Sequence, residues 1–132
     1  MATEHWDVGD VHVTKVIDLE IRPPLEFLGE LLPKSSSVEI DTMRWLQPDY
    51  VSDGTTSWGF YSFLIEAPGR KVVIDTAVGN AKPRAAEIFN MLDTAYLENF
   101  RHVWEPDEVD AVLCTHMHFD HVGWNTRLDG GK

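Results

Sequence analysis

Three histidines and one aspartate lie within six residues near the end of the sequence: His116, His118, Asp120 and His121. In an extended segment residues two apart point the same way, so His116 and His118 can present their imidazoles to one cation. Asp120 and His121 are adjacent, and a bend there would turn both toward a second cation. Neutral imidazole nitrogens and ionised carboxylate oxygens are ligands that suit zinc, iron or manganese. This segment therefore predicts a metal site.

A histidine-rich loop also has an ordinary explanation, which is a solvated surface segment that holds no specific metal. The other histidines of the chain, His5, His12 and His102, are interpreted in that way, as surface or hydrogen-bonded residues. Met117 and Phe119 alternate with the candidate ligands and are expected to pack rather than to take part in chemistry. The density of donors in one short segment favours the metal site over the solvated loop.

The apolar run at residues 109–114 directly precedes the candidate ligands and predicts a short buried strand. A loop that leaves such a strand is held by a rigid scaffold and stays reachable by solvent. Cys114 is the only cysteine of the chain, and its place in this apolar run favours an inert buried thiol over a nucleophile or a zinc ligand.

The earlier part of the chain supplies further elements. Approximate polar and apolar alternation predicts a strand at 11–19. Two β-rich runs at 58–66 and 71–75, joined by a turn that contains Pro68 and Gly69, predict a hairpin. Apolar residues at three- and four-residue steps after Pro83 predict a helix that ends near residues 102–106.

The stretch at 22–53 lacks a regular pattern and is rich in proline and serine, which predicts a long excursion with short helical turns. Long loops of this kind are often functional lids or disordered segments. We expect its Phe27, Trp45 and Tyr50 to pin the excursion to the core, and the alternative is a role at a substrate entrance.

The composition limits the class of protein. A chain of 132 residues that is 43% hydrophobic can form one domain with its own core. The 22 acidic against 11 basic side chains give a formal charge of −11, which argues against a nucleic-acid partner. The single cysteine, the absence of a signal-peptide pattern and the absence of a long apolar run predict a cytoplasmic protein without a membrane partner.

The segment His116-x-His118-x-Asp120-His121, with a strand before it and Gly123 after it, resembles the signature of the metallo-β-lactamase-fold hydrolases. Residues 72–76 are similar to the earlier strand of this family, which ends in an aspartate beneath the metal site. The ordinary explanation of that aspartate is a turn cap. The stretches at 79–84 and 114–126 look most like lactonase-type and other small-ester-type members.

The resemblance implies an α+β fold, namely the αββα four-layer sandwich of the metallo-β-lactamases. Residues 1–132 would supply only the N-terminal part of that single domain. The resemblance also implies two divalent metal ions, with zinc as the expected metal. His116 and His118 would ligate the first ion, and Asp120 and His121 the second.

The family resemblance gives further residues supporting roles. Asp120 would also orient the metal-held water, which makes it the candidate catalytic residue. Asp75 would hold ligands in orientation from behind. Gly123 would let the following helix or turn pack closely.

The family also uses a further histidine for the first metal, a carboxylate that bridges both metals and a distant histidine for the second. Residues 122–132 contain no histidine and a single acid, Asp129. We therefore interpret the sequence as a piece of a longer hydrolase. Catalytic zinc normally has three protein ligands, so the chain alone is expected to bind metal weakly and to hydrolyse little. Half a sandwich exposes a sheet face, which predicts a homo-oligomer or aggregation.

The leading interpretation is a metal-dependent hydrolase that opens a lactone or similar ester with metal-bound hydroxide in the complete protein. Thioesterases, phosphodiesterases, nucleases and β-lactam hydrolases share the motif, and di-iron oxidoreductases use a similar ligand set. The acid excess weighs against the nucleases. A non-catalytic metal-binding or interaction module is the alternative from a different class, and metal stoichiometry together with turnover would separate it from the enzyme.

Overall fold

A computed structural model describes residues 4–32, 34 and 36–130 of the chain. The chain divides into two compact units. One consists of Met1–Leu19 with Phe60–Lys132, and the other of Glu20–Gly59. No helix in the described ranges has the length and apolar character that crossing a membrane requires.

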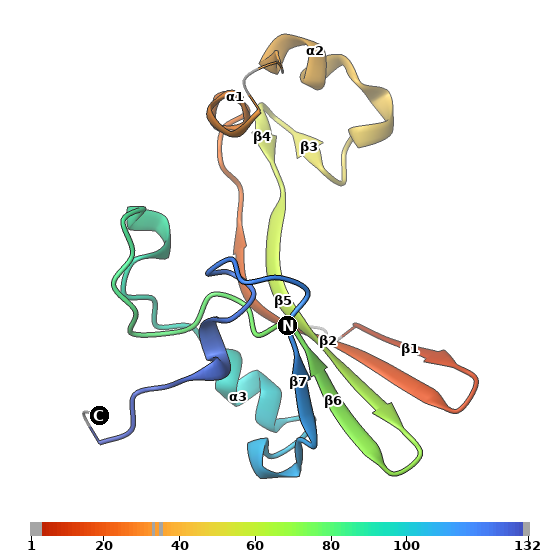
Figure 1. The fold of residues 1–132 in the computed structure, drawn as a ribbon. Coiled ribbons are helices and arrows are strands. Elements are labelled where there is room, and N and C mark those ends of the chain that lie inside the picture. Colours follow the sequence, from red (N-terminus) through yellow and green to blue (C-terminus); the bar gives the residue numbers. More distant parts are fainter. Residues whose placement is uncertain (1–3, 33, 35, 131–132) are drawn as a thin grey trace. The chain divides into compact units, whose positions relative to one another are not determined.

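A mixed five-stranded sheet with the order β1-β2-β5-β6-β7 forms the framework of the larger unit (Figure 1). Its strands are β1 (Glu4–Val8), β2 (Val11–Ile21), β5 (Trp58–Ala67), β6 (Arg70–Ile74) and β7 (Ala111–Leu113). β1 and β2 are antiparallel, as are β5 and β6, whereas β6 and β7 run parallel. The predicted early strand and the predicted hairpin are therefore confirmed, and β1 is a strand that the sequence pattern did not indicate.

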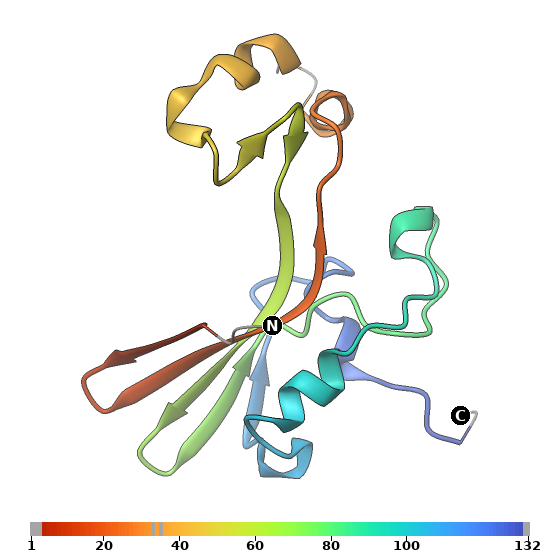
Figure 2. The same ribbon diagram turned by 180° about the vertical axis from the view of Figure 1, so that it is seen from behind.

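Helix α3 (Tyr96–Arg101) packs on the sheet and closes the hydrophobic core of this unit (Figure 2). The buried core residues are Val16, Leu64, Val73, Tyr96, Phe100 and Trp104. The first three come one each from β2, β5 and β6, which are neighbouring strands of the sheet. The Tyr96 hydroxyl shares a hydrogen bond of 2.5 Å with Ser62, so the one polar group of this helix face is satisfied inside the core.

The prediction of one helix that begins near Pro83 and ends near residues 102–106 is wrong for most of its length, because only its last part forms a helix. Only a 3-10 turn, η2 (Glu87–Phe89), and the short helix α3 form in this range. The chain folds back instead, with the Ala81 amide donating to the Leu92 carbonyl and the Met91 amide to the Lys82 carbonyl, both at 2.9 Å. The apolar spacing fits a helix, but the backbone amides use these bonds across the loop in place of the i to i−4 bonds that a helix requires.

The prediction of a buried strand at 109–114 is only partly correct. The strand forms as β7, but all three of its residues are exposed, including Val112 and Leu113. β7 is the last strand of the described sheet and pairs only with β6. The apolar sequence therefore predicts the strand correctly, but it does not predict the exposure of the strand's side chains.

The smaller unit contains α1 (Glu26–Leu31), α2 (Ser37–Thr42), the 3-10 turn η1 (Arg44–Leu46) and a two-stranded ladder of β3 (Val51–Ser52) and β4 (Thr55–Thr56). The predicted excursion with short helical turns is confirmed, although Pro33 and Ser35 lie outside the described residues. Phe27 packs on Trp58 at a ring distance of 5.5 Å. Trp45 and Tyr50 are 75% and 61% exposed, so the expectation that they pin the excursion is wrong.

Two loops at one end of the sheet determine the position of the candidate ligands. Residues 75–77 follow β6, and residues 121–124 come after β7 and the histidine-rich segment. The Thr76 amide donates to the His121 carbonyl, the Gly123 amide to the Ala77 carbonyl and the Trp124 amide to the Thr76 carbonyl, each at 2.8 Å. This pairing joins two segments that are more than forty residues apart in sequence.

The close approach at Gly123, which the family resemblance implied, is present. A Cβ atom on Gly123 would lie 2.0 Å from the backbone carbon of Val78 and 2.5 Å from the Ala77 carbonyl oxygen. Gly123 opens the 3-10 turn η4 (Gly123–Asn125). No side chain fits at this position without separating the two loops.

We expect Gly123→Ala to lower the free energy of unfolding by about 2–3 kcal/mol or more, because the added methyl group meets backbone rather than a movable side chain. Urea denaturation monitored by circular dichroism would measure the loss. The matched control is Gly29→Ala in α1, where the Cβ would meet nothing within 4 Å. Equal stability of the two variants would show that the loops are not in close contact.

Candidate metal site

The three histidine side chains of the motif lie together after β7. The ring centres of His116 and His118 are 4.5 Å apart, and those of His116 and His121 are 4.0 Å apart. The His121 amide donates to the His118 carbonyl at 3.0 Å, which closes a tight turn. The chain thus bends at Asp120 and His121, as the sequence predicted. Met117, in contrast, is exposed, so the prediction that it packs is wrong.

Asp75 connects the loop after β6 to this cluster. Its carboxylate accepts hydrogen bonds from the Thr115 amide at 2.7 Å, from the Thr115 hydroxyl at 2.8 Å and from His121 Nδ1 at 2.8 Å. Its side chain is only 13% exposed. Burial alone would raise the pKa of Asp75, but the hydrogen bonds from His121 and Thr115 outweigh it and hold the pKa below its ordinary value. Asp75 is therefore an ionised acceptor at neutral pH.

These hydrogen bonds determine which ring nitrogens remain free. Because ionised Asp75 can only accept, His121 must carry its proton on Nδ1, which leaves the lone pair on Nε2. The Thr115 hydroxyl gives its single proton to Asp75 and can accept from His116 Nδ1, 3.0 Å away. The Nε2 atoms of His116 and His121 are thus both available as electron-pair donors.

Asp120 lies beside His121 at the half-buried end of the cluster. Its Oδ2 is 3.5 Å from His121 Nε2, so these two donor atoms face each other. The imidazoles of His116 and His118 are exposed, which leaves them open to solvent and to small molecules. Both nitrogen and oxygen donors are therefore presented on an accessible surface.

The chemistry of these donors fits a divalent cation, but the set is partial. Within residues 4–32, 34 and 36–130, no three His, Cys, Asp or Glu side chains are arranged to hold one ion. Catalytic zinc sites generally use three protein ligands and keep one position open. The described residues therefore offer pairs of donors rather than a closed site.

Two residues that support this region were missed by the sequence interpretation. Thr115 bridges Asp75 and His116, and its only signal was its position next to the motif. Asp18 is one of the polar residues that alternate with apolar ones along β2, yet it is buried and 6% exposed. Its Oδ2 accepts from the Val78 and Gly79 amides at 3.0 and 3.1 Å, which holds the loop after β6 in place.

Cys114 has a structural contact only. It is half-buried, and its Sγ accepts a hydrogen bond from Asn125 Nδ2 at 3.6 Å. The imidazole rings, in contrast, contact Thr115, Asp75 and one another.

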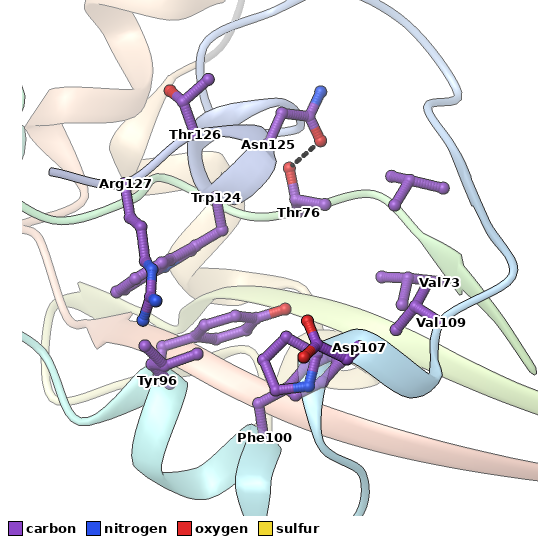
Figure 3. A pocket seen from close by; sticks show the side chains of 13 residues that line it. Val73, Thr76, Tyr96, Phe100, Asp107, Val109, Trp124, Asn125, Thr126 and Arg127 are labelled. Atoms are coloured by element: carbon purple, nitrogen blue, oxygen red, sulfur yellow. Dashed lines mark hydrogen bonds between the residues drawn. The ribbon is translucent and has the colours of Figure 1, made fainter. Parts of the chain in front are cut away.

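A cavity of about 320 Å³ lies on the core side of the paired loops (Figure 3). Tyr96 and Phe100 of α3 line it together with Val73, Thr76 and Trp124. The Thr76 hydroxyl donates to Asn125 Oδ1 at 2.8 Å at its edge. None of the candidate ligands lines this cavity, so it is separate from the candidate metal site.

A family model and a known protein sequence both match part of this chain. The model of the metallo-beta-lactamase superfamily matches residues 59–130, more than half of the chain. A UPF0173 metal-dependent hydrolase of Myxococcus xanthus (strain DK1622) is 37% identical over 70 residues, which are 52% of this chain and 19% of that protein.

Solved structures show the same fold at low sequence identity. The hydrolase AbOPH of the beta lactamase superfamily matches with a TM-score of 0.67 at 21% identity, over 91% of this chain and 38% of its own. AidC, a dizinc quorum-quenching lactonase, matches with 0.68 at 19% identity, over 92% and 38%. A probable metal-dependent hydrolase from Staphylococcus aureus matches with 0.64 at 20% identity, over 89% and 41%.

The chain spans about two fifths of the length of these solved structures and about one fifth of the relative from M. xanthus. The expected fold class, a part of the α+β metallo-β-lactamase fold, is therefore confirmed. From the match of the family model to residues that include the whole histidine-rich motif, we conclude that this chain belongs to the metallo-beta-lactamase superfamily.

Proposed function

We propose that this chain provides the first metal ligands of a metal-dependent hydrolase that opens a lactone or a similar small ester. The observation that carries the proposal is the cluster of three imidazoles, in which Asp75 and Thr115 leave the Nε2 atoms of His121 and His116 free. The description of AidC as a dizinc lactonase supports both the substrate class and zinc as the metal. Because the chain spans only part of these proteins, the proposed activity is that of the complete protein.

In this proposal His116 and His118 contribute nitrogen donors to one cation, and Asp120 and His121 contribute to a second. When bound, two divalent cations would lower the pKa of water so that hydroxide forms near neutral pH, and would polarise the carbonyl oxygen under attack. Asp120, whose Oδ2 is 3.5 Å from His121 Nε2, would also orient the metal-held water. Asp75 keeps the His121 ring in one tautomer and one orientation.

The surface charge agrees with a small neutral substrate. The formal charge of −11 repels polyanions such as nucleic acid, but it has little effect on an uncharged lactone. Exposed imidazoles at the end of a sheet suit a substrate that arrives from solvent.

The activity itself is tested with the product of the complete reading frame that contains this sequence. We expect it to open a short-chain lactone in the presence of Zn²⁺ and to lose that activity when a chelator is added. Two bound ions without turnover of lactones, thioesters or phosphodiesters would instead favour the non-catalytic metal-binding module.

Metal binding by the 132-residue chain is expected to be weak and to depend on the motif. Titration with Co²⁺, followed by its visible absorption, should show His118→Ala weakening the binding at least tenfold, because one of few nitrogen donors is removed. His102→Ala, which removes an exposed histidine of the α3 terminus, is the control and should bind as the unmodified chain does. Equal binding by both variants would mean that the motif is a solvated loop.

We expect Asp75→Asn to weaken metal binding by about 10- to 100-fold, since the amide cannot accept all the hydrogen bonds that orient His121 and Thr115. Asparagine tolerates the backbone φ of 55° at this position, so the change acts on the side chain. The matched control is Asp129→Asn, which removes the same charge from an exposed residue. An unchanged Co²⁺ affinity in Asp75→Asn would mean that Asp75 does not position the ligands.

A further inference from the structure

Arg84 lies in the loop that folds back between β6 and α3. Its amide donates to Asn90 Oδ1 at 2.9 Å, and the neighbouring backbone is fixed by the hydrogen bond from the Met91 amide to the Lys82 carbonyl. Asn80 and Thr94 close the same loop through hydrogen bonds of 2.9 Å in both directions. The backbone of Arg84 is therefore held in place, and its side chain leaves the loop from a fixed point.

The Arg84 guanidinium contacts the histidine-rich motif through the side chain of Phe119. Its central carbon is 5.0 Å from the ring centre of Phe119, which stands between His118 and Asp120 in the motif. The Phe119 ring packs on Phe89 at 5.1 Å, and Phe89 packs on Phe60 at 5.2 Å. A row of aromatic rings thus supports both the arginine and the motif, as was expected for Phe119.

The cation–π contact with Phe119 gives the guanidinium N–H groups no hydrogen-bond acceptor. Arg84 Nε is buried and has no hydrogen-bond partner. No carboxylate in the described part of the chain forms an ion pair with Arg84, although Arg70, Arg101 and other basic side chains are paired in this way. A buried Nε–H without an acceptor is unusual in a chain with twice as many acids as bases, because buried polar groups generally have a hydrogen-bond partner.

We propose that Arg84 binds an oxyanion, a carboxylate or a phosphate group, beside the candidate metal site. The planar fork of N–H donors matches both groups through two parallel hydrogen bonds. The net negative charge of the chain disfavours random anion binding, so an anion retained here must be held by local contacts. In the proposed hydrolase Arg84 would recognise the carboxylate that hydrolysis of the neutral ester releases, and this assignment rests on the proposed function.

Anion binding is tested on the 132-residue chain without metal. The result then does not depend on whether the complete protein is a hydrolase. The ¹⁵N-labelled chain in a chelator at pH 8 is titrated separately with acetate and with inorganic phosphate, at constant ionic strength. We expect the Arg84 Nε–H signal to shift and saturate with at least one of them, at a concentration at least tenfold below that needed for Arg127. Saturation with acetate alone identifies a carboxylate site, and saturation with phosphate alone a phosphate site.

Two variants separate the contribution of the guanidinium's planar shape from that of its positive charge. Arg84→Lys keeps the charge but loses the fork and the Nε–H, and we expect it to weaken anion binding about tenfold, as seen in the amide signals of residues 118–120. Arg127→Met changes the net charge at an exposed residue and should leave the binding unchanged. If Arg84 responds no more strongly than Arg127 to either anion, or if Arg84→Lys binds as well as the unmodified chain, the proposal is wrong.

Discussion

Backbone pairing between the loop after β6 and the segment after the histidine-rich motif is the constraint on which the candidate site depends. Both segments leave neighbouring parallel strands, so they meet at the same end of the sheet. Three hydrogen bonds of 2.8 Å join them, and the missing side chain of Gly123 allows the contact. His121 lies inside this pairing, which fixes its backbone. Its ring nitrogen bonds to Asp75 of the same loop, which fixes the imidazole of this candidate ligand.

The loop after β6 takes a shape that an unsupported chain would avoid. Asp75, Ala77 and Ala81 have φ values of 55°, 44° and 55°, a region that side chains other than those of glycine, asparagine and aspartate rarely enter. Buried Asp18 offsets this cost, since its carboxylate accepts from two loop amides and from the Thr94 hydroxyl. The carboxylates of Asp18, below the loop, and of Asp75, within it, therefore stabilise the strained backbone. Both accept several hydrogen bonds from neighbouring groups.

The elements that the sequence revealed are those whose side chains alternate or cluster locally. The hairpin and the early strand follow from period-two patterns, and the donors of the motif lie within six residues. The failures have long-range causes. Residues 83–95 have helical spacing, but Asn80 and Thr94 close them into a loop, and Asp18 has a polar strand position that is buried by a loop sixty residues later. A local sequence pattern carries no information about contacts between distant residues. Only the family resemblance therefore predicted that Asp75 would lie against the candidate ligands.

The distribution of charge decides how a chain of net charge −11 could attract an anion. At physiological ionic strength the field of an exposed charge falls off over about 8 Å, so acids on distant surfaces contribute little at the motif. Charged and polar groups that contact the motif matter more, among them Asp75, Asp120 and Arg84. Lys82 is close in sequence but its ammonium group donates to Thr126, so it is committed to the fold. Arg84 is therefore the cation of this loop whose donors remain for a ligand, and its place against Phe119 couples that ligand to the backbone that carries the candidate metal donors.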